Sequence, residues 1–224
     1  MALALHRHDD SAALLEAIVD AAVSIVPGAE GSSIRVLPGR HRPVSEAATS
    51  DLARRIEAIQ DEVQQGPSLD AVHQQQPVRV DDVNADSRWP GFAARAAVTG
   101  TASVLALRLS VEGGNLGAVS LYSPIPGAFT DESERVGRLV ADHAAVACDA
   151  VRKQESLALA LAHRDLIGQA KGMIMERYQI TGEQAFHMLS RVSQNTNRKL
   201  HEISRELVES GTLGGHHGLP PRPH

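Results

Sequence analysis

The chain has 224 residues, enough for one large domain or two of modest size, and its 42% hydrophobic and 22% charged residues are typical of a folded globular protein. Aromatic residues make up only 3%, which argues against a base-stacking sheet that needs several exposed Phe or Tyr side chains. The net charge of −5 excludes a basic coat over the whole protein. Residues 1–155 carry a net charge of −7 and residues 156–210 carry +1, so any contact with nucleic-acid phosphates is expected in the last third.

The expected environment of the chain follows from its cysteine usage and its lack of long apolar runs. The single cysteine, Cys148, cannot form an internal disulfide, which suits a reducing compartment. The apolar residues 1–5 are too few for the core of a signal peptide, and no apolar run approaches the roughly 20 residues that span a bilayer. We therefore expect a soluble, cytoplasmic protein without a membrane partner.

The first 130 residues mix helical and strand patterns. Helices are expected at 10–26, at 51–65 behind the N-cap Ser50, in a short piece after Gly66-Pro67, and through Phe92 and Ala96. Strands are expected at 33–37, 43–48, 77–80, 103–109 and 116–122. Pro38-Gly39 and Gly113-Gly114-Asn115 are expected turns, the second of them in a hairpin. This order predicts an α+β domain over residues 1–130 with a mostly antiparallel sheet.

A long helix is expected to follow Thr130, because no proline occurs from residue 127 to 219 and acidic residues fill the first turn. Positions 136, 139, 143, 146, 150, 153, 157 and 160 form a heptad stripe of Val, Leu, His, Val, Ala, Lys, Leu and Ala. The helix could pack only on its own sheet, or it could pair with a second copy as a parallel coiled coil. We favour the coiled coil in a homodimer, with residues 131–156 as the connecting helix, because the stripe continues past the expected end of the sheet.

Residues 157–211 predict an all-α bundle of three helices. Thr181-Gly182-Glu183-Gln184 is a capping box that opens a helix to about Gln194. Asn195-Thr196-Asn197 is expected to break this helix and to cap a last one, 198–209. The tail, residues 212–224, is rich in Gly, Pro and His and is expected to be disordered. The expected core of the bundle is Leu166, Ile167, Ala170, Met173, Ile174, Phe186, Met188, Leu189, Leu200, Ile203 and Leu207.

Two groups of motifs resemble known families. The segment 165–177 (DLIGQAKGMIMER), followed in register by Ala185-Phe186, Leu189 and 193–200 (SQNTNRKL), resembles ANTAR domains, which are three-helix modules that bind paired hairpin loops in nascent transcripts. The segments 66–71, 78–82, 88–92 and 116–122 resemble the GAF half of actinobacterial GAF–ANTAR regulators. The resemblance implies a GAF-like sensor domain (1–130) and an ANTAR RNA-binding domain (157–211) in a signal-responsive transcription antiterminator.

Candidate RNA-binding residues lie in the last third of the chain. Amide side chains can read the edges of unstacked bases, and Arg and Lys can bind phosphates. The candidates are Arg164, Lys171, Arg191, Gln194, Asn195, Thr196, Asn197, Arg198 and Lys199. The alternatives are that 195–197 form only a turn and cap, and that Lys171 is an ordinary exposed lysine.

The motifs of common enzymes are missing from the sequence. Residues 201–205 begin like a zinc-protease helix, but Arg205 replaces the second His, and one cysteine excludes the cysteine-rich zinc sites. Neither a phosphate-binding loop nor a nucleophile elbow occurs. Ser68 stands where many relatives have cysteine, so a thiol-based role there is not expected. We expect no catalytic residue, metal or cofactor, and a sensor that binds an unidentified small molecule or only dimerises.

Two other functions are compatible with the sequence. Three short helices could also form a DNA-binding helix-turn-helix regulator with a GAF sensor. The weak net charge of the last third argues mildly against it, because duplex DNA binding usually needs a basic stripe. A GAF-fold catalyst ranks third, because no paired nucleophile and base is visible.

Overall fold

The computed structural model describes residues 2–37, 44–74, 76–112 and 114–212. The predicted turn at Pro38-Gly39, the glycine at position 113 of the hairpin turn and the tail from residue 213 lie outside these ranges. The chain divides into two compact units, Met1–Arg152 and Lys153–His224, and the long helix α5 (Asp131–Tyr178) contributes to both. The boundaries predicted at residues 130, 156 and 211 remain predictions.

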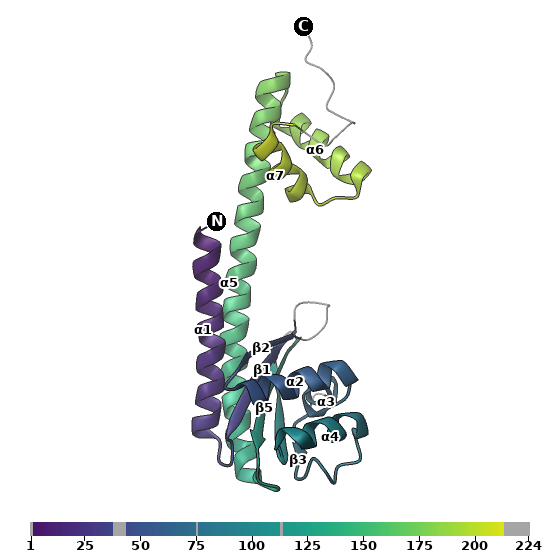
Figure 1. Cartoon of the computed structure of the whole chain (residues 1–224). Coiled ribbons are helices and arrows are strands. Elements are labelled where there is room, and N and C mark those ends of the chain that lie inside the picture. The colour runs from purple at the N-terminus through teal and green to yellow at the C-terminus, as the bar shows by residue number, and fades with distance from the viewer. Residues whose placement is uncertain (1, 38–43, 75, 113, 213–224) are drawn as a thin grey trace. The chain divides into compact units, whose positions relative to one another are not determined.

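The N-terminal unit is a five-stranded antiparallel sheet covered by helices on both faces (Figure 1). The strands are β1 (Gly31–Val36), β2 (Val44–Ala48), β3 (Val78–Val80), β4 (Ser103–Val111) and β5 (Gly114–Ser123), in the order β2-β1-β5-β4-β3. The hairpin of β4 and β5 is confirmed by their antiparallel pairing. The predicted α+β class with an antiparallel sheet is therefore confirmed.

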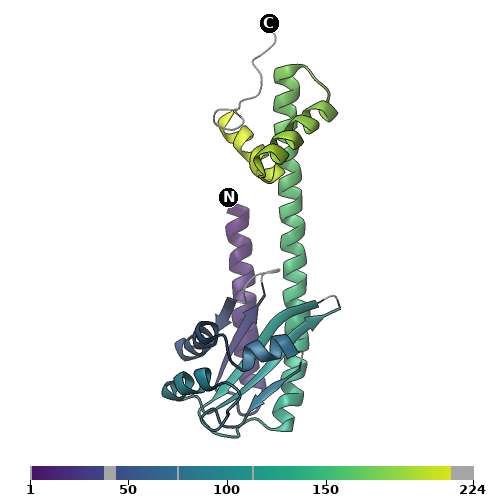
Figure 2. The same ribbon diagram turned by 90° about the vertical axis from the view of Figure 1, so that its right-hand side faces the viewer.

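Helices α1 (Ala2–Ile25) and the first part of α5 cover one face of the sheet, and α2 (Asp51–Val63), α3 (Pro67–Gln74) and α4 (Pro90–Ala96) cover the other, as Figures 1 and 2 show. A one-turn helix, Ala97–Thr99, follows α4. Each face has its own apolar core, one between α1, α5 and the sheet and one beneath α2, α3 and α4. The first helix begins at Ala2 rather than at residue 10, because Ala and Leu favour helix and the charged residues among them do not break it.

The packing of α5 on its sheet uses small residues. Gly137, Ala141, Ala144 and Ala145 are buried against it, and a Cβ atom on Gly137 would come within 2.5 Å of a Leu107 methyl carbon. Of the heptad stripe, Val136 packs against this core, whereas Leu139 and Val146 are 62% and 65% exposed. The apolar stripe recognised in the sequence thus only partly coincides with the face of α5 that packs on the sheet.

The C-terminal unit consists of the end of α5, helix α6 (Gly182–Thr196) and helix α7 (Leu200–Ser210). Its core joins one pair of residues from each helix: Ala170 and Ile174, Ala185 and Leu189, Ile203 and Leu207. The predicted capping box at the start of α6 is confirmed, because the Thr181 hydroxyl accepts from the Gln184 amide and the Gln184 side chain accepts from the Thr181 amide. The predicted three-helix arrangement is confirmed.

The end of α6 corrects one prediction. Residues 195 and 196 are still helical, and the helix ends at Asn197, which adopts the left-handed conformation (φ 52°) that Asn tolerates at a helix C-terminus. The N-cap of α7 is Lys199, whose side chain makes no capping hydrogen bond. The predicted end of α6 within 195–197 is therefore confirmed at Asn197, whereas the prediction that this segment caps the last helix is wrong, because Lys199 is the N-cap of α7.

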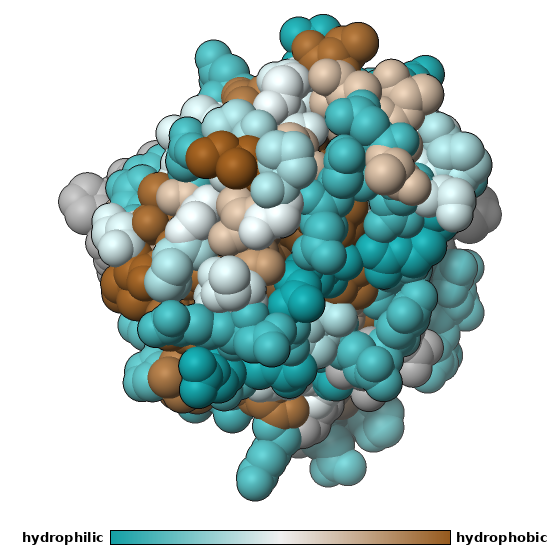
Figure 3. All heavy atoms as spheres, turned by 90° about the horizontal axis from the view of Figure 1, so that it is seen from below, coloured by the Kyte–Doolittle hydropathy of each residue, from teal (hydrophilic) through white to brown (hydrophobic). Residues whose placement is uncertain are grey.

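No helix in the described part of the chain is both long enough and apolar enough to cross a membrane. At the end of the molecule seen in Figure 3, hydrophobic residues lie in separate groups among hydrophilic ones.

Candidate functional site

The connection between α6 and α7 presents the predicted polar residues as one exposed turn. All six residues from Gln194 to Lys199 are exposed. The amide of Asn197 donates to the carbonyl oxygens of Gln194 and Ser193, and the Ser193 hydroxyl donates to the Arg198 carbonyl oxygen at 2.6 Å. These bonds fix the backbone of the turn and leave its amide side chains available to a ligand.

Not every candidate in this turn is free of intramolecular partners. Arg198 forms an ion pair with Glu206 of α7 at 2.6 Å, and both side chains are partly exposed. The Thr196 hydroxyl donates to the Val192 carbonyl oxygen at 2.7 Å. A phosphate bound at Arg198 would therefore compete with a carboxylate for the guanidinium group.

The other three candidates lie on different surfaces of the same unit. Arg164 and Lys171 are seven residues apart, so they share one face of α5. Arg164 makes an exposed contact with Asp165 at 3.4 Å. The Lys171 Nζ atom lies 6.0 Å from the ring centroid of Phe186. Arg191 lies five residues after Phe186 on α6 and therefore points about 140° away from it around the helix axis. The structure thus brings Lys171 to the α5–α6 side and leaves Arg191 on another side of α6.

Phe186 corrects the predicted core of the bundle. Ala170, Ile174, Leu189, Ile203 and Leu207 are buried as predicted, but Phe186 is 41% exposed. Its neighbour Ala185 takes the inward position instead, because α6 turns by about 100° per residue. The apolar periodicity of the sequence does not distinguish a residue at the edge of a helix face from one at its centre.

A pair of histidines at the junction of α5 and α7 has no simple sequence signal. The rings of His163 and His201 stack with centroids 3.7 Å apart and an interplanar angle of 11°. Partial desolvation lowers the pKa of His201, and the charges of His163, Lys199 and Arg205 lower it further against the opposing effect of Glu202. Protonation of both rings would place like charges in contact, so the stack favours the neutral form of His201.

The N-terminal unit contains a fully buried polar network centred on Glu57 of α2. Arg35 of β1 forms an ion pair with Glu57, and both side chains are 0% exposed. One carboxylate oxygen of Glu57 accepts from the hydroxyls of Ser33, Ser68 and Tyr122 at 2.9, 2.8 and 2.6 Å. The network therefore connects β1, β5, α2 and α3.

The protonation states in this network are set by the ion pair. Burial alone would raise the pKa of Glu57, but the Arg35 charge and the hydrogen bonds from Tyr122, Arg35 and Ser68 outweigh it and hold the pKa below its usual value. Burial and the Glu57 charge raise the pKa of Tyr122 well above its usual value. Glu57 is thus a carboxylate and Tyr122 a neutral donor at pH 7.

Ser68 of α3 is one of the hydroxyl donors of this network. Its hydroxyl donates to Glu57, receives a hydrogen bond from the Gln60 amide at 2.9 Å and lies 2.6 Å from the Ser120 hydroxyl. The only cysteine, Cys148, is buried on α5, and this burial raises the pKa of its thiol to about 11. A thiolate is therefore disfavoured at Cys148, and position 68 holds a hydrogen-bonded hydroxyl instead of a thiol.

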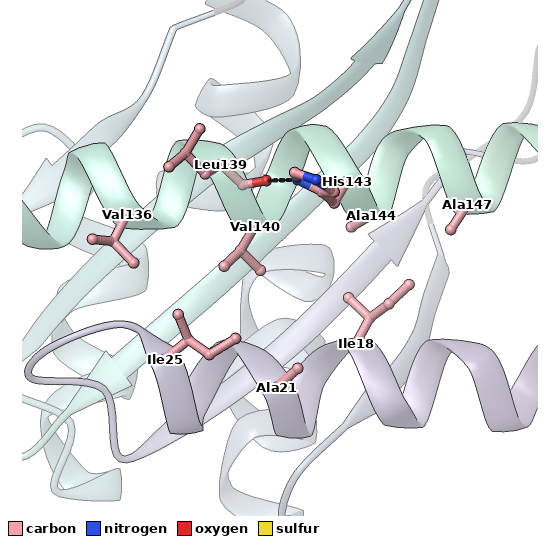
Figure 4. Close-up of a pocket in the computed structure, with 9 residues that line it drawn as sticks. All are labelled: Ile18, Ala21, Ile25, Val136, Leu139, Val140, His143, Ala144 and Ala147. Carbon is pink, nitrogen blue, oxygen red and sulfur yellow. Dashed lines mark hydrogen bonds between the residues drawn. The ribbon is translucent and has the colours of Figure 1, made fainter.

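An apolar groove of about 440 Å³ runs between α1 and α5 on the N-terminal unit (Figure 4). The residues that line it are Ile18, Ala21, Ile25, Val136, Leu139, Val140, His143, Ala144 and Ala147. Its polar member, His143, shares a 2.8 Å hydrogen bond with the Leu139 carbonyl oxygen of its own helix. Ile25 and Leu139 are 56% and 62% exposed, so this face leaves large apolar side chains in water.

Comparisons with known families agree with this division into two units. Residues 8–149 match the GAF domain family, and residues 155–208 match the ANTAR domain family. Together the matches define a sensor unit followed by an RNA-binding output unit. The chain belongs to the GAF domain family and carries an ANTAR domain, which makes it an RNA-binding antitermination regulator with a GAF sensor.

Solved structures share the fold of the sensor unit. The GAF domain region of a Geobacter sulfurreducens protein is 15% identical, with a TM-score of 0.55, and the match covers 65% of this chain and 97% of that one. A domain described as part of a two-component sensor histidine kinase protein from Sinorhizobium meliloti is 18% identical (TM-score 0.52, 64% and 94% covered). The GAF domain of PixJ from Thermosynechococcus elongatus is 10% identical (TM-score 0.52, 71% and 96% covered). A search of the curated proteins finds no significant match.

Proposed function

We propose that this protein is a cytoplasmic, non-catalytic antiterminator whose ANTAR domain binds paired hairpin loops in nascent transcripts and whose GAF domain sets that binding in response to a small molecule. The observation that carries the proposal is the exposed α6–α7 turn within the residues that match the ANTAR family, with amide side chains and two cations in six consecutive positions. Loop recognition needs this combination, because amides reach base edges and cations neutralise phosphates. In this proposal the sensor spans 1–130, the connecting helix 131–156 and the output domain 157–211.

The proposed RNA-binding residues are Arg164, Lys171, Arg191 and the turn from Gln194 to Lys199. The first prediction is that Lys171→Ala, Arg198→Ala and Lys199→Ala each weaken binding to an RNA with two adjacent hairpins. Each is expected to flatten the plot of log affinity against log salt by about one unit for each phosphate that the variant no longer neutralises. Filter binding across a salt series measures both quantities.

The control for this prediction is Arg54→Ala, which removes an exposed cation of α2 in the other unit and should change neither affinity nor slope. A duplex DNA of the same length serves as the competing ligand. Equal affinity for the DNA and the paired hairpins would contradict the proposed function and favour the helix-turn-helix alternative. If all three variants keep the salt slope of the parent protein, the RNA binds to another surface.

We also propose a homodimer formed through the α1–α5 groove and the heptad stripe. The exposed side chains of Ile25, Leu139 and Val146 support it, because each leaves apolar surface in water that a second copy would cover. The polar positions His143 and Lys153 would fix the register of the paired helices. Paired RNA hairpins are matched by paired output domains in such a dimer.

The second prediction concerns this interface. Leu139→Glu combined with Val146→Glu should shift the protein from dimer to monomer, because each protomer would have to bury two carboxylates without partners. Sedimentation equilibrium at micromolar concentration measures the shift. Val98→Glu is the matched control, because Val98 is 84% exposed in the one-turn helix after α4 and lies outside the groove. A parent protein that is monomeric and still binds paired hairpins fully would rule out the dimer.

A further inference from the structure

Phe186 is exposed in a chain that otherwise buries its phenylalanines. The sequence contains three, and Phe92 and Phe129 are 1% and 3% exposed, whereas Phe186 is 41% exposed in the second turn of α6. A Phe side chain held partly in water forgoes a favourable transfer of apolar surface into the core. A large aromatic ring kept at the surface of a small helical unit therefore points to a ligand that covers it.

The surroundings of Phe186 combine apolar surface with one positive charge. The Nζ atom of Lys171 lies 6.0 Å from the ring centroid, and Met175, one turn further along α5, is 38% exposed. Gly182 at the start of α6 lies beside both, since a Cβ atom there would be at ordinary contact distance, 3.6 Å from Lys171 Nζ and 3.5 Å from the Met175 sulfur. We call these four residues (Lys171, Met175, Gly182 and Phe186) the α5–α6 patch.

The cation of this patch is available to an external anion. Within the described part of the chain, no carboxylate lies within ion-pairing distance of Lys171, in contrast to Arg164 and Arg198, which have acidic neighbours. At an exposed site, an aromatic ring attracts a neighbouring lysine amine only weakly. A phosphate can therefore replace the ring as the main partner of the Lys171 amine. The patch thus combines a partly exposed aromatic ring with an anion-binding group 6.0 Å from its centroid.

We propose that Phe186 is a stacking platform for one unpaired nucleobase of the RNA loop and that Lys171 binds a phosphate next to that base. Every base has a π-face that can stack on a phenyl ring, and single-stranded RNA is bound by such aromatic platforms together with cations. The patch is separate from the polar turn, where amides can read base edges. The inference rests on the proposed RNA-binding function. It adds a base contact by Phe186, a residue that the apolar spacing of the sequence predicts in the core.

The test uses the full-length protein and RNA hairpin pairs that carry the fluorescent base 2-aminopurine at one loop position at a time. Phe186→Leu keeps the apolar character of the side chain and removes the ring. It should weaken binding about 5- to 140-fold, which corresponds to the roughly 1–3 kcal/mol of one base–aromatic stack. It should also abolish the quenching of 2-aminopurine at one loop position while leaving the salt slope unchanged. Lys171→Gln should instead reduce the slope by about one unit.

Two variants complete the test. Phe186→Tyr retains the ring and should bind within about twofold of the parent, and His187→Leu, which removes the exposed ring at the next position of α6, should bind like the parent. An RNA with an abasic site at the quenched position should be insensitive to Phe186→Leu, because variant and abasic site remove the same stacking interaction. If Phe186→Leu binds as tightly as the parent, the inference is wrong and the patch is left to a protein partner. If Phe186→Leu weakens binding by the same factor on the abasic RNA, the ring does not stack on that base, and the inference alone is overturned. A parent protein that binds neither RNA would remove the proposed function and the inference together.

Discussion

Glu57→Ala is expected to lower the free energy of unfolding of the sensor unit by about 3–5 kcal/mol, because it leaves Arg35 buried without its main carboxylate partner. The guanidinium group is 0% exposed and would keep only the partly exposed Asp61 as an acidic neighbour. The hydroxyls of Ser33, Ser68 and Tyr122 would lose their common acceptor at the same time. Removing one partner of a buried network costs more than the network itself contributes, since the groups that stay behind remain desolvated.

Urea unfolding followed by tryptophan fluorescence measures this change in stability. Trp89 is the only tryptophan of the chain and is buried in the sensor unit beside α2 and α3, so its signal reports on this unit. Asp51→Ala is the matched control, because it also removes a carboxylate of α2 that pairs with an arginine, but at the surface. The control is expected to change the stability by less than about 1 kcal/mol. Equal destabilisation in the two variants would show that the buried ion pair does not hold the sensor together.

The sequence predicts the elements of both units well because their signals are local. The hairpin of β4 and β5 follows from two alternating segments around a glycine-rich turn, and α6 begins where the capping box places it. The sequence does not identify the exact end of α6, because Asn195, Asn197 and Lys199 are all acceptable at a helix end by residue type. Only the backbone conformation decides that Asn197 ends the helix.

The buried network could not be predicted in the same way. Arg35, Glu57, Ser68 and Tyr122 come from four different elements, and each residue type is usually exposed or only partly buried. Glu57 lies within an amphipathic helix in which a charged residue would be placed on the outer face. The tertiary fold brings the opposite charge of Arg35 to it, and this contact has no counterpart in local sequence.

The candidate RNA-binding surface shows the same division. The turn from Gln194 to Lys199 is recognisable because six polar residues are consecutive. The patch around Phe186 is not, because Lys171 and Phe186 are 15 positions apart and meet only when α5 and α6 pack side by side. Apolar spacing assigns Phe186 to the core, and only its exposure in the folded unit shows that it lies at the edge of the packed face.

Gly117→Ala is expected to destabilise the sensor unit by a comparable amount through the backbone. Gly117 lies in β5 opposite Val36 of β1 with φ at +148°, a conformation that residues with a Cβ atom rarely adopt. A Cβ atom at this position would overlap the Arg35 carbonyl oxygen, so β1 and β5 would have to separate. Strained backbone costs about 1–3 kcal/mol and overpacking about the same, which predicts a destabilisation of about 2–6 kcal/mol in the same urea experiment.

Gly31→Ala is the matched control for this second variant. Gly31 is a buried strand glycine of β1 paired with Tyr122 of β5, but the nearest atoms to a Cβ there are the Thr49 hydroxyl oxygen and a Tyr122 ring carbon, both at 3.8 Å. That is ordinary contact distance, so the extra methyl group fits, and the reduced freedom of the unfolded chain should make the change neutral or stabilising by up to about 1 kcal/mol. Because Arg35 contributes its carbonyl oxygen to the close approach at Gly117 and its side chain to the ion pair with Glu57, Gly117→Ala should also disturb the buried network. If Gly117→Ala unfolds at the same urea concentration as Gly31→Ala, the close approach of β1 and β5 does not constrain this position, and the strand pairing around Arg35 must tolerate a side chain there.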